Sequence, residues 1–434
     1  MVRVRPVLVT PLLTVALLLP TAPVHAAGRQ VTFPDLDGVV LRHGDLVGAV
    51  VTHSTVETGR GETYTQVTTD HYDTRGRLVL SSGVGTDPEG AVVTRSESTS
   101  DYDAQGRLVH ESVVDDWDGD GPGAPLTRAT VTTFDERGYV VEKEVTVDEE
   151  SDGVPEQRTV YSFGNDRKGR VVATTTKDDP DNDGVVDTVN RGETVYDAKG
   201  NVLGSSWTAS TPQGGSLGSG ELVNTYGAHE QLTSTTSSSY GPDGSLVERT
   251  ATETAYDARG NAVELTTTYD MDGVPGTDWR TVNTLTYDGH GRLLTSSHSG
   301  YGPDATVPSV VGEVRYAYDA QGHPVLTETL GDQDGDGVVE PLGRLETTYD
   351  HAGRPVLMEG TFDGGSTRTA FGYDNRGRAA SRVTTFYDAS DALTSRSAVG
   401  YAYPSRTDYV VTTEIDQDGD GVTDATMVET RRVA

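Results

Sequence analysis

Short stretches in which polar and β-branched residues alternate recur along most of the chain. Examples are ETYTQVTTDHYD, RLVHESVVD, LTRATVTTFD and RLETTYD, each of roughly ten residues and without helical spacing. In the stretch that ends at Tyr256, the residues Thr252 and Thr254 share a face with the tyrosine, because side chains alternate along a strand. The pattern predicts β-strands that carry a stripe of tyrosines on one face.

A YDxxGR turn follows every second stretch. The aspartate of such a turn can accept a hydrogen bond from the backbone two residues on, and the glycine four places after the tyrosine supplies a positive φ. We therefore predict hairpin turns. The clear copies start at Tyr72, Tyr102, Tyr196, Tyr256, Tyr287, Tyr318, Tyr349 and Tyr373, and degenerate copies start at Phe134, Phe163, Tyr226 and Tyr403. The Phe163 copy reaches Gly169 only with a two-residue insertion.

A second kind of turn, with the pattern DxDxDGxxD in its clearest copies, lies between successive YD turns. The alternation of the two turns gives a repeat of about 31 residues and about two dozen antiparallel strands. A flat sheet of that width would have to curl, because sheets twist. The predicted fold is all-β, a long antiparallel meander in a curled or spiral sheet, with a closed large barrel as the alternative.

The N-terminus has the features of an export signal. Arg3 and Arg5 precede the apolar run VLVTPLLTVALLLP, and Val24-His25-Ala26 forms a small-residue cleavage site. We predict a signal peptide at 1–26, an N-terminal cap or irregular first unit at 27–65, and the YD-repeat array at 66–434. No comparable apolar run follows, so the sequence predicts a secreted, extracellular protein without a membrane span.

The charge of the chain favours cations as ligands. The formal net charge is −33 and there is no cysteine, so disulfides are excluded and nucleic acid is a poor partner. An exported chain without disulfides needs another source of stability, and a bound metal is one such source.

The acidic turns provide the ligands that calcium prefers. In DQDGDGVTD, alternate carboxylates can converge on one cation, a glycine allows the bend, a valine offers its carbonyl oxygen and a last acid closes the site. The predicted ligands are Asp416, Asp418, Asp420, Val422 and Asp424; Asp332, Asp334, Asp336, Val338 and Glu340; Asp179, Asp181, Asp183, Val185 and Asp187; and Asp148, Glu150, Asp152, Val154 and Glu156. A fifth loop offers Asp116, Asp118 and Asp120.

The repeated string YDxxGRL resembles the YD repeats of the Rhs family, over about Tyr72 to Tyr403. That resemblance implies a hollow β-shell, which in the family often encloses a C-terminal toxin. The acidic loops resemble the calcium loops of integrin propeller blades and of thrombospondin type 3 repeats. None has the glutamate at the twelfth position that an EF-hand requires.

The sequence shows no catalytic motif. It contains no GxSxG, no HExxH and no phosphate-binding loop, and its acids belong mainly to the repeated loops. We predict a secreted, calcium-stabilised structural or adhesive scaffold without catalysis, with calcium and a cell-surface protein or polysaccharide as partners. The alternatives are a shell or accessory component of an Rhs-type toxin system and a calcium-dependent carbohydrate-active protein.

Overall fold

A computed structural model describes residues 45–59, 61–116, 126–149, 152–271, 273, 276–303, 305–332 and 338–434. These residues form one sheet of 26 antiparallel strands. The strands are β1 Val50–Gly59, β2 Glu62–Tyr72, β3 Leu78–Thr86, β4 Val92–Tyr102, β5 Leu108–Asp116, β6 Leu126–Phe134, β7 Val140–Asp148, β8 Gln157–Asn165, β9 Val171–Asp179, β10 Thr188–Tyr196, β11 Val202–Ser210, β12 Ser216–Tyr226, β13 Leu232–Tyr240, β14 Leu246–Tyr256, β15 Ala262–Asp270, β16 Trp279–Tyr287, β17 Leu293–Tyr301, β18 Val310–Tyr318, β19 Pro324–Gly331, β20 Glu340–Tyr349, β21 Pro355–Phe362, β22 Gly365–Tyr373, β23 Ala379–Asp388, β24 Leu393–Ala402, β25 Tyr409–Asp416 and β26 Ala425–Val433.

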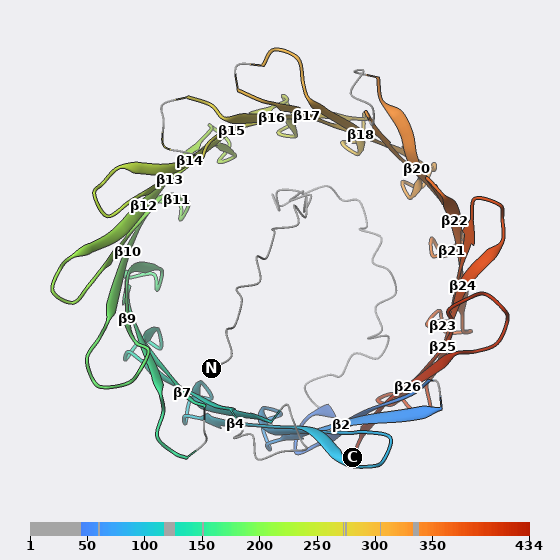
Figure 1. Cartoon of the computed structure of the whole chain (residues 1–434), viewed down its shortest axis with the longest axis horizontal. Coiled ribbons are helices and arrows are strands. Elements are labelled where there is room, and N and C mark those ends of the chain that lie inside the picture. The colour runs from blue at the N-terminus through green and yellow to red at the C-terminus, as the bar shows by residue number, and fades with distance from the viewer. Residues whose placement is uncertain are drawn as a thin grey trace, which may run out of the picture.

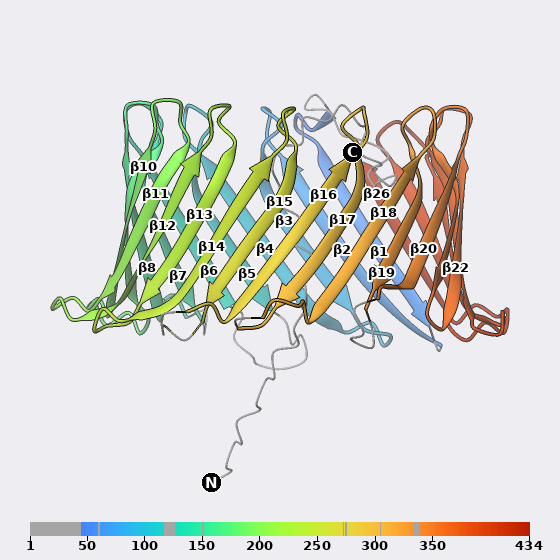
Figure 2. The same cartoon turned by 90° about the horizontal axis from the view of Figure 1, so that it is seen from above.

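The sheet closes on itself. Each strand pairs with the next, and β1 also pairs antiparallel with β26, from Val51 opposite Val433 to Gly59 opposite Ala425. Figures 1 and 2 show the resulting wide barrel from its end and from its side. The predicted all-β meander is confirmed, and the closed barrel is the geometry that the chain adopts.

Strand β1 and the start of β2 lie in the segment 27–65, so this segment contributes strands to the barrel. The predicted signal peptide lies outside the described residues. Among the described residues no helix is long and apolar enough to cross a membrane.

The YD turns that contain the aspartate are fixed by it. In the turn after β4, one carboxylate oxygen of Asp103 accepts hydrogen bonds from the amides of Gln105 and Arg107, both at 2.9 Å. The other oxygen accepts from Nε of Arg107 at 2.6 Å, and Gly106 has a φ of 87°. The residues that recur in this turn thus form a compact hairpin in which the aspartate and the arginine pair with each other.

Consecutive YD turns are also linked to each other. The hydroxyl of Tyr102 donates to the carbonyl of Leu78, just after the preceding YD turn, at 2.9 Å. The guanidinium carbon of Arg77 lies 4.4 Å from the centre of the Tyr102 ring. We call this repeated pair of contacts the tyrosine ladder. The hydroxyl contact recurs at Tyr196, Tyr226, Tyr256, Tyr287, Tyr318, Tyr349, Tyr373 and Tyr403.

One YD turn has a different register from the predicted one. Asn165, not Phe163, occupies the place of the tyrosine, because Asn165 pairs with Val171 across the same bulge that follows the other turns. Gly169 is then four residues on and has a φ of 81°, so no insertion is present. The side-chain amide of Asn165 donates to the carbonyl of Val140 at 2.8 Å and replaces the tyrosine hydroxyl.

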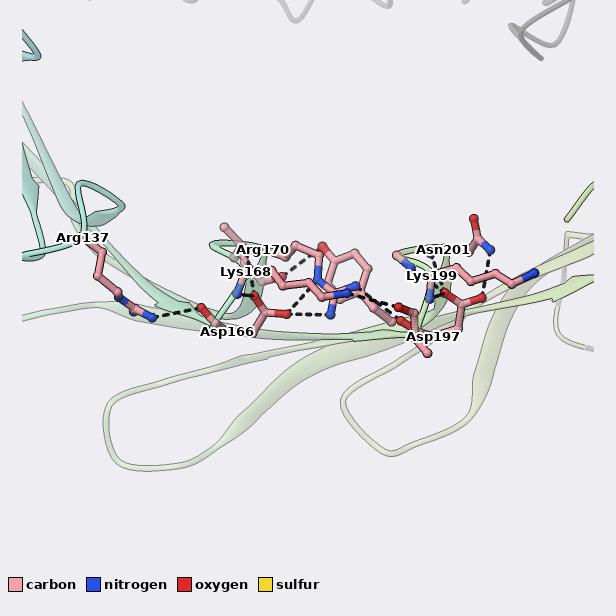
Figure 3. A network of polar contacts seen from close by, with 11 residues as sticks. Arg137, Asp166, Lys168, Arg170, Asp197, Lys199 and Asn201 are labelled. Carbon is pink, nitrogen blue, oxygen red and sulfur yellow. Dashed lines mark hydrogen bonds and ion pairs between the residues drawn. The ribbon is translucent and has the colours of Figure 1, made fainter.

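The turn tyrosines face the inside of the ring. Figure 1 shows tight hairpins folded inward and wider loops extending outward, and Figure 3 shows Asp166 and Arg170 on the side of the sheet away from those wide loops. The guanidinium carbon of Arg170 lies 4.5 Å from the centre of the Tyr196 ring, so Tyr196 is on the inner side too. Residues that share the face of a turn tyrosine form the inner wall, and the residues between them form the outer wall.

Candidate functional site

Three acidic loops bring their carboxylates together at the rim opposite the YD turns. In each of the three groups, one ligand oxygen per residue lies within 4.8 Å of the others. The groups are Asp148, Asp152 and Glu156; Asp179, Asp181 and Asp183; and Asp416, Asp418 and Asp420. The structure therefore contains three acidic clusters with dimensions that suit a metal ion.

The first aspartate organises each cluster. Asp148, Asp179 and Asp416 are only 7%, 3% and 5% exposed. Each accepts a hydrogen bond from the loop glycine five residues on, at 2.9, 3.1 and 3.0 Å respectively. These glycines have φ values of 89°, 87° and 87°, so the three loops share one backbone geometry. The arrangement directs the following carboxylates to one side of the turn.

The remaining predicted ligands of these loops lie in other positions. Asp424 accepts a hydrogen bond from the amide of Gln417 at 2.6 Å and is not in its cluster, and neither is Asp187. The amides of Val154, Val185 and Val422 donate to the third acid of their loops at 2.8, 2.7 and 2.7 Å. Of these three described loops, only the one that starts at Asp148 brings its ninth-position acid, Glu156, into the cluster.

The other predicted ligands fall partly outside the described residues. Glu150, Asp118, Asp120, Asp334 and Asp336 belong to that group. Of the same loops, Asp116 lies at the end of β5, Asp332 and Val338 flank the undescribed segment, and Glu340 starts β20. For the loops 116–124 and 332–340 the ligand set stays a prediction.

Large apolar side chains open onto the inner wall of the barrel. Trp207 lies opposite Gly192, which shares the face of Tyr196, and it is 47% exposed. Phe362 and Phe386 share the face of Tyr373 and are 48% and 40% exposed. The alternation around each turn tyrosine was the sequence signal for this surface, but the sequence did not show that the face encloses a lumen.

Charged pairs occupy the outer wall. Arg315 pairs with Glu313, and Arg344 pairs with Glu346. Both pairs lie on the face opposite the nearest turn tyrosine, in the middle of β18 and β20. Exposed aromatic groups thus lie on the inner wall, where the Asp166–Arg170 pair of a YD turn lies too, while these two ion pairs and exposed valines such as Val195 lie on the outer wall.

A network on the inner wall was not predicted from the sequence. The carboxylate of Asp178 accepts hydrogen bonds from the hydroxyls of Thr159 and Thr188, at 3.0 and 3.1 Å. Asp178 precedes the cluster residue Asp179, and the alternation of the strand sends the two side chains to opposite walls. Of these two adjacent acids, Asp178 holds neighbouring strands together on the inner wall, and Asp179 belongs to a candidate metal site.

No family model matches this chain, and no curated protein matches it. Among solved structures, the Tc holotoxin pore of Photorhabdus luminescens aligns at 13% identity and a TM-score of 0.18, over 84% of this chain and 25% of that chain. A porin-like protein from Bacteroides uniformis aligns at 11% identity and a TM-score of 0.20, over 68% and 93%. OprB of Pseudomonas putida aligns at 7% identity and a TM-score of 0.16, over 89% and 91%.

This chain spans about a quarter of the toxin chain that it matches. At such TM-scores the likenesses establish no family and no activity. Two of the matched barrels are described as porin-like proteins.

The match to porin-like barrels contradicts several predictions. These are a freely secreted calcium-stabilised scaffold, an extracellular location, a cell-surface protein or polysaccharide as partner, and a chain without a membrane span. The physical reason for the error is that the sequence shows strands and turns but not their closure into a barrel. The described structure is a large closed β-barrel with three acidic clusters at one rim.

Proposed function

We propose that this protein is a hollow barrel of YD repeats, related to those of the Rhs family, that encloses an extended polymer guest in its lumen. The observation that carries the proposal is the exposure of Trp207, Phe362 and Phe386 on the inner wall. Exposed aromatic side chains on a concave wall offer apolar surfaces on which a guest can pack. The proposed role requires no catalytic residue.

The distribution of charge supports the same proposal. A lipid-facing barrel has apolar side chains outside and polar ones inside. Here the ion pairs Arg315–Glu313 and Arg344–Glu346 lie on the outer wall, and aromatic groups lie on the inner wall. The exposed aromatic groups, which a guest could contact, are therefore on the inner wall.

Protease protection tests the proposal. We expect a labelled, permanently unfolded polypeptide, carboxymethylated lactalbumin, to resist trypsin longer when the barrel is present. Replacing the inner residue Trp207 with Glu should abolish the protection. The matched change Val195→Glu, at an outer position that is 58% exposed, should leave it intact. Equal cleavage with and without the barrel would refute the proposal.

A second candidate is an aqueous channel, favoured by the closed ring of 26 strands. Conductance steps after addition of the protein to a planar lipid bilayer, without protection of an unfolded polypeptide, would favour the channel. Protection without conductance would favour the enclosing barrel.

We further propose that the three acidic clusters bind calcium. Carboxylate oxygens are hard donors, which calcium prefers. In the cluster of Asp179, the Oδ1 atom is buried and makes no hydrogen bond within the described structure. A buried carboxylate oxygen without a partner is costly, and a cation would satisfy it. The chemistry of the residues thus fits the ion, which would also reduce the repulsion among the acids.

A further inference from the structure

Strands β21 to β24 carry a pocket on the inner wall. It has a volume of about 170 Å³ and is lined mainly by apolar and hydroxyl-bearing side chains. Its inner-wall members include Met358, Thr369, Phe371, Thr384 and Tyr401, together with one cation, Arg382.

Arg382 lies in an apolar row that crosses the strands. Phe371 of β22 is directly opposite on one side, and Val399 of β24 is directly opposite on the other. Val399 is 4% exposed and belongs to a buried cluster with Tyr409 and Val411. An arginine between an aromatic residue and a buried valine can lay its stem on an apolar surface and keep its charged head in solvent, and Arg382 is exposed.

The charge of Arg382 has no carboxylate partner in the part of the chain that the structure describes. No ion pair or hydrogen bond joins Arg382 to another described residue, whereas Arg354 and Arg378 of the neighbouring YD turns each pair with the aspartate of their own turn. The nearest acid on the same strand and face, Asp388, is six residues away, roughly 20 Å along the strand.

The geometry points to this pocket as a recognition site for a carboxylate that adjoins an aromatic or apolar group, supplied by an acidic residue of the enclosed guest. The guanidinium can bind a carboxylate with two hydrogen bonds, and Phe371 and Tyr401 offer a surface for the adjoining ring. Thr369 and Thr384, whose hydroxyl oxygens are 3.1 Å apart, add donors beside it. The inference rests on the proposed function, because the guest supplies the carboxylate.

Fluorine NMR with 4-fluorophenylacetate tests the pocket without any guest. We expect saturable broadening of its signal, no effect on 4-fluorophenylacetamide, and at least a tenfold loss of affinity in Arg382→Gln. The matched control is Arg396→Gln, on the next strand and the outer wall, which should bind as the parent does. Equal binding by Arg382→Gln, or equal binding of the amide, would overturn the proposal.

A competition arm separates the guest from a free small acid. A capped peptide containing Phe-Asp should displace the fluorinated probe, and the Phe-Asn peptide should not. If only small acids bind, a contact with the guest is refuted. Probe binding without protease protection would refute the enclosing role alone, and protection without probe binding would refute this pocket alone.

Discussion

The guanidinium of Arg77 lies over the ring of Tyr102, 4.4 Å from its centre, while the hydroxyl of Tyr102 binds the carbonyl that follows Arg77. The two residues belong to successive YD turns. One side chain therefore fixes the distance and the orientation between two hairpins, and the repetition of this contact around the rim holds the hairpins in order.

Removing one hydroxyl of the tyrosine ladder should lower stability measurably. Tyr287→Phe deletes the donor to Ala262, whose carbonyl lies 2.9 Å away, and should cost about 1 kcal/mol in the free energy of unfolding. Tyr240→Phe removes an exposed contact to Glu221 outside the ladder and should cost less than about 0.5 kcal/mol. Urea unfolding curves measure both, and equal costs would show that the ladder contact has no special role.

A side chain at the glycine of a YD turn should strain the backbone. Gly260 has a φ of 87° and no neighbour within 4 Å of an added Cβ, so Gly260→Ala tests the backbone alone. We expect a loss of about 1 to 2 kcal/mol. Gly289, in another YD turn, has similar space but no positive φ, so Gly289→Ala should be neutral or slightly stabilising. Thermal melting compares the two, and an unchanged melting temperature for Gly260→Ala would contradict the turn geometry.

The lowered pKa values of the aspartates in the YD turns predict that the protein loses stability in acid. Hydrogen bonds from the side chain and backbone of Arg77 lower the pKa of Asp73 to about 2, and Arg354 does the same for Asp350. Because the folded pKa lies below the unfolded value of about 3.9, this contribution is present above pH 4 and is lost as the pH falls towards 2. Melting in chelator at pH 6, 4, 3 and 2 should show this window. Arg354→Met should flatten the curve, and a curve that is flat in the parent protein would contradict the account.

Calcium should stabilise the barrel through the three acidic clusters. If each site binds at about 0.1 to 1 mM, 1 mM calcium adds roughly 1 to 4 kcal/mol in total. Calorimetry should count at least three sites, and Asp183→Asn should remove one of them. Asp243→Asn, in a turn at the same rim but outside the clusters, should leave the count unchanged. A count that Asp183→Asn does not change would refute that cluster as a site.

Local features of the chain were predictable, and the long-range ones were not. The YD turn is specified within a few residues, so its aspartate and glycine could be read directly from the sequence. The register of the Asn165 turn was missed because a phenylalanine two residues earlier matched the aromatic position better than an asparagine does. The side-chain amide of Asn165 donates a hydrogen bond to the carbonyl of Val140 and so compensates for the missing tyrosine, a contact that only the fold reveals.

Closure of the ring had no sequence signal. It brings together residues such as Ser54 and Thr430, which lie 376 positions apart and face each other across β1 and β26. Each of these strands has the same alternating pattern as its neighbours, and that pattern fits an open edge as well as a closed one. The function predicted from the sequence failed for the same reason, because a lumen exists only when the last strand meets the first.

A disulfide across this closing pair is the most direct test of the central claim. The chain has no cysteine, so Ser54→Cys with Thr430→Cys introduces the only two thiols. The side-chain oxygens of Ser54 and Thr430 lie 2.6 Å apart, so cysteine sulfurs at these two positions would be close enough to form a disulfide. The pair Thr369→Cys with Thr384→Cys, within one hairpin, is the positive control. The closed barrel predicts rapid cross-linking within a monomer for both pairs, and cross-linking of the control pair alone, or only between molecules, would contradict it.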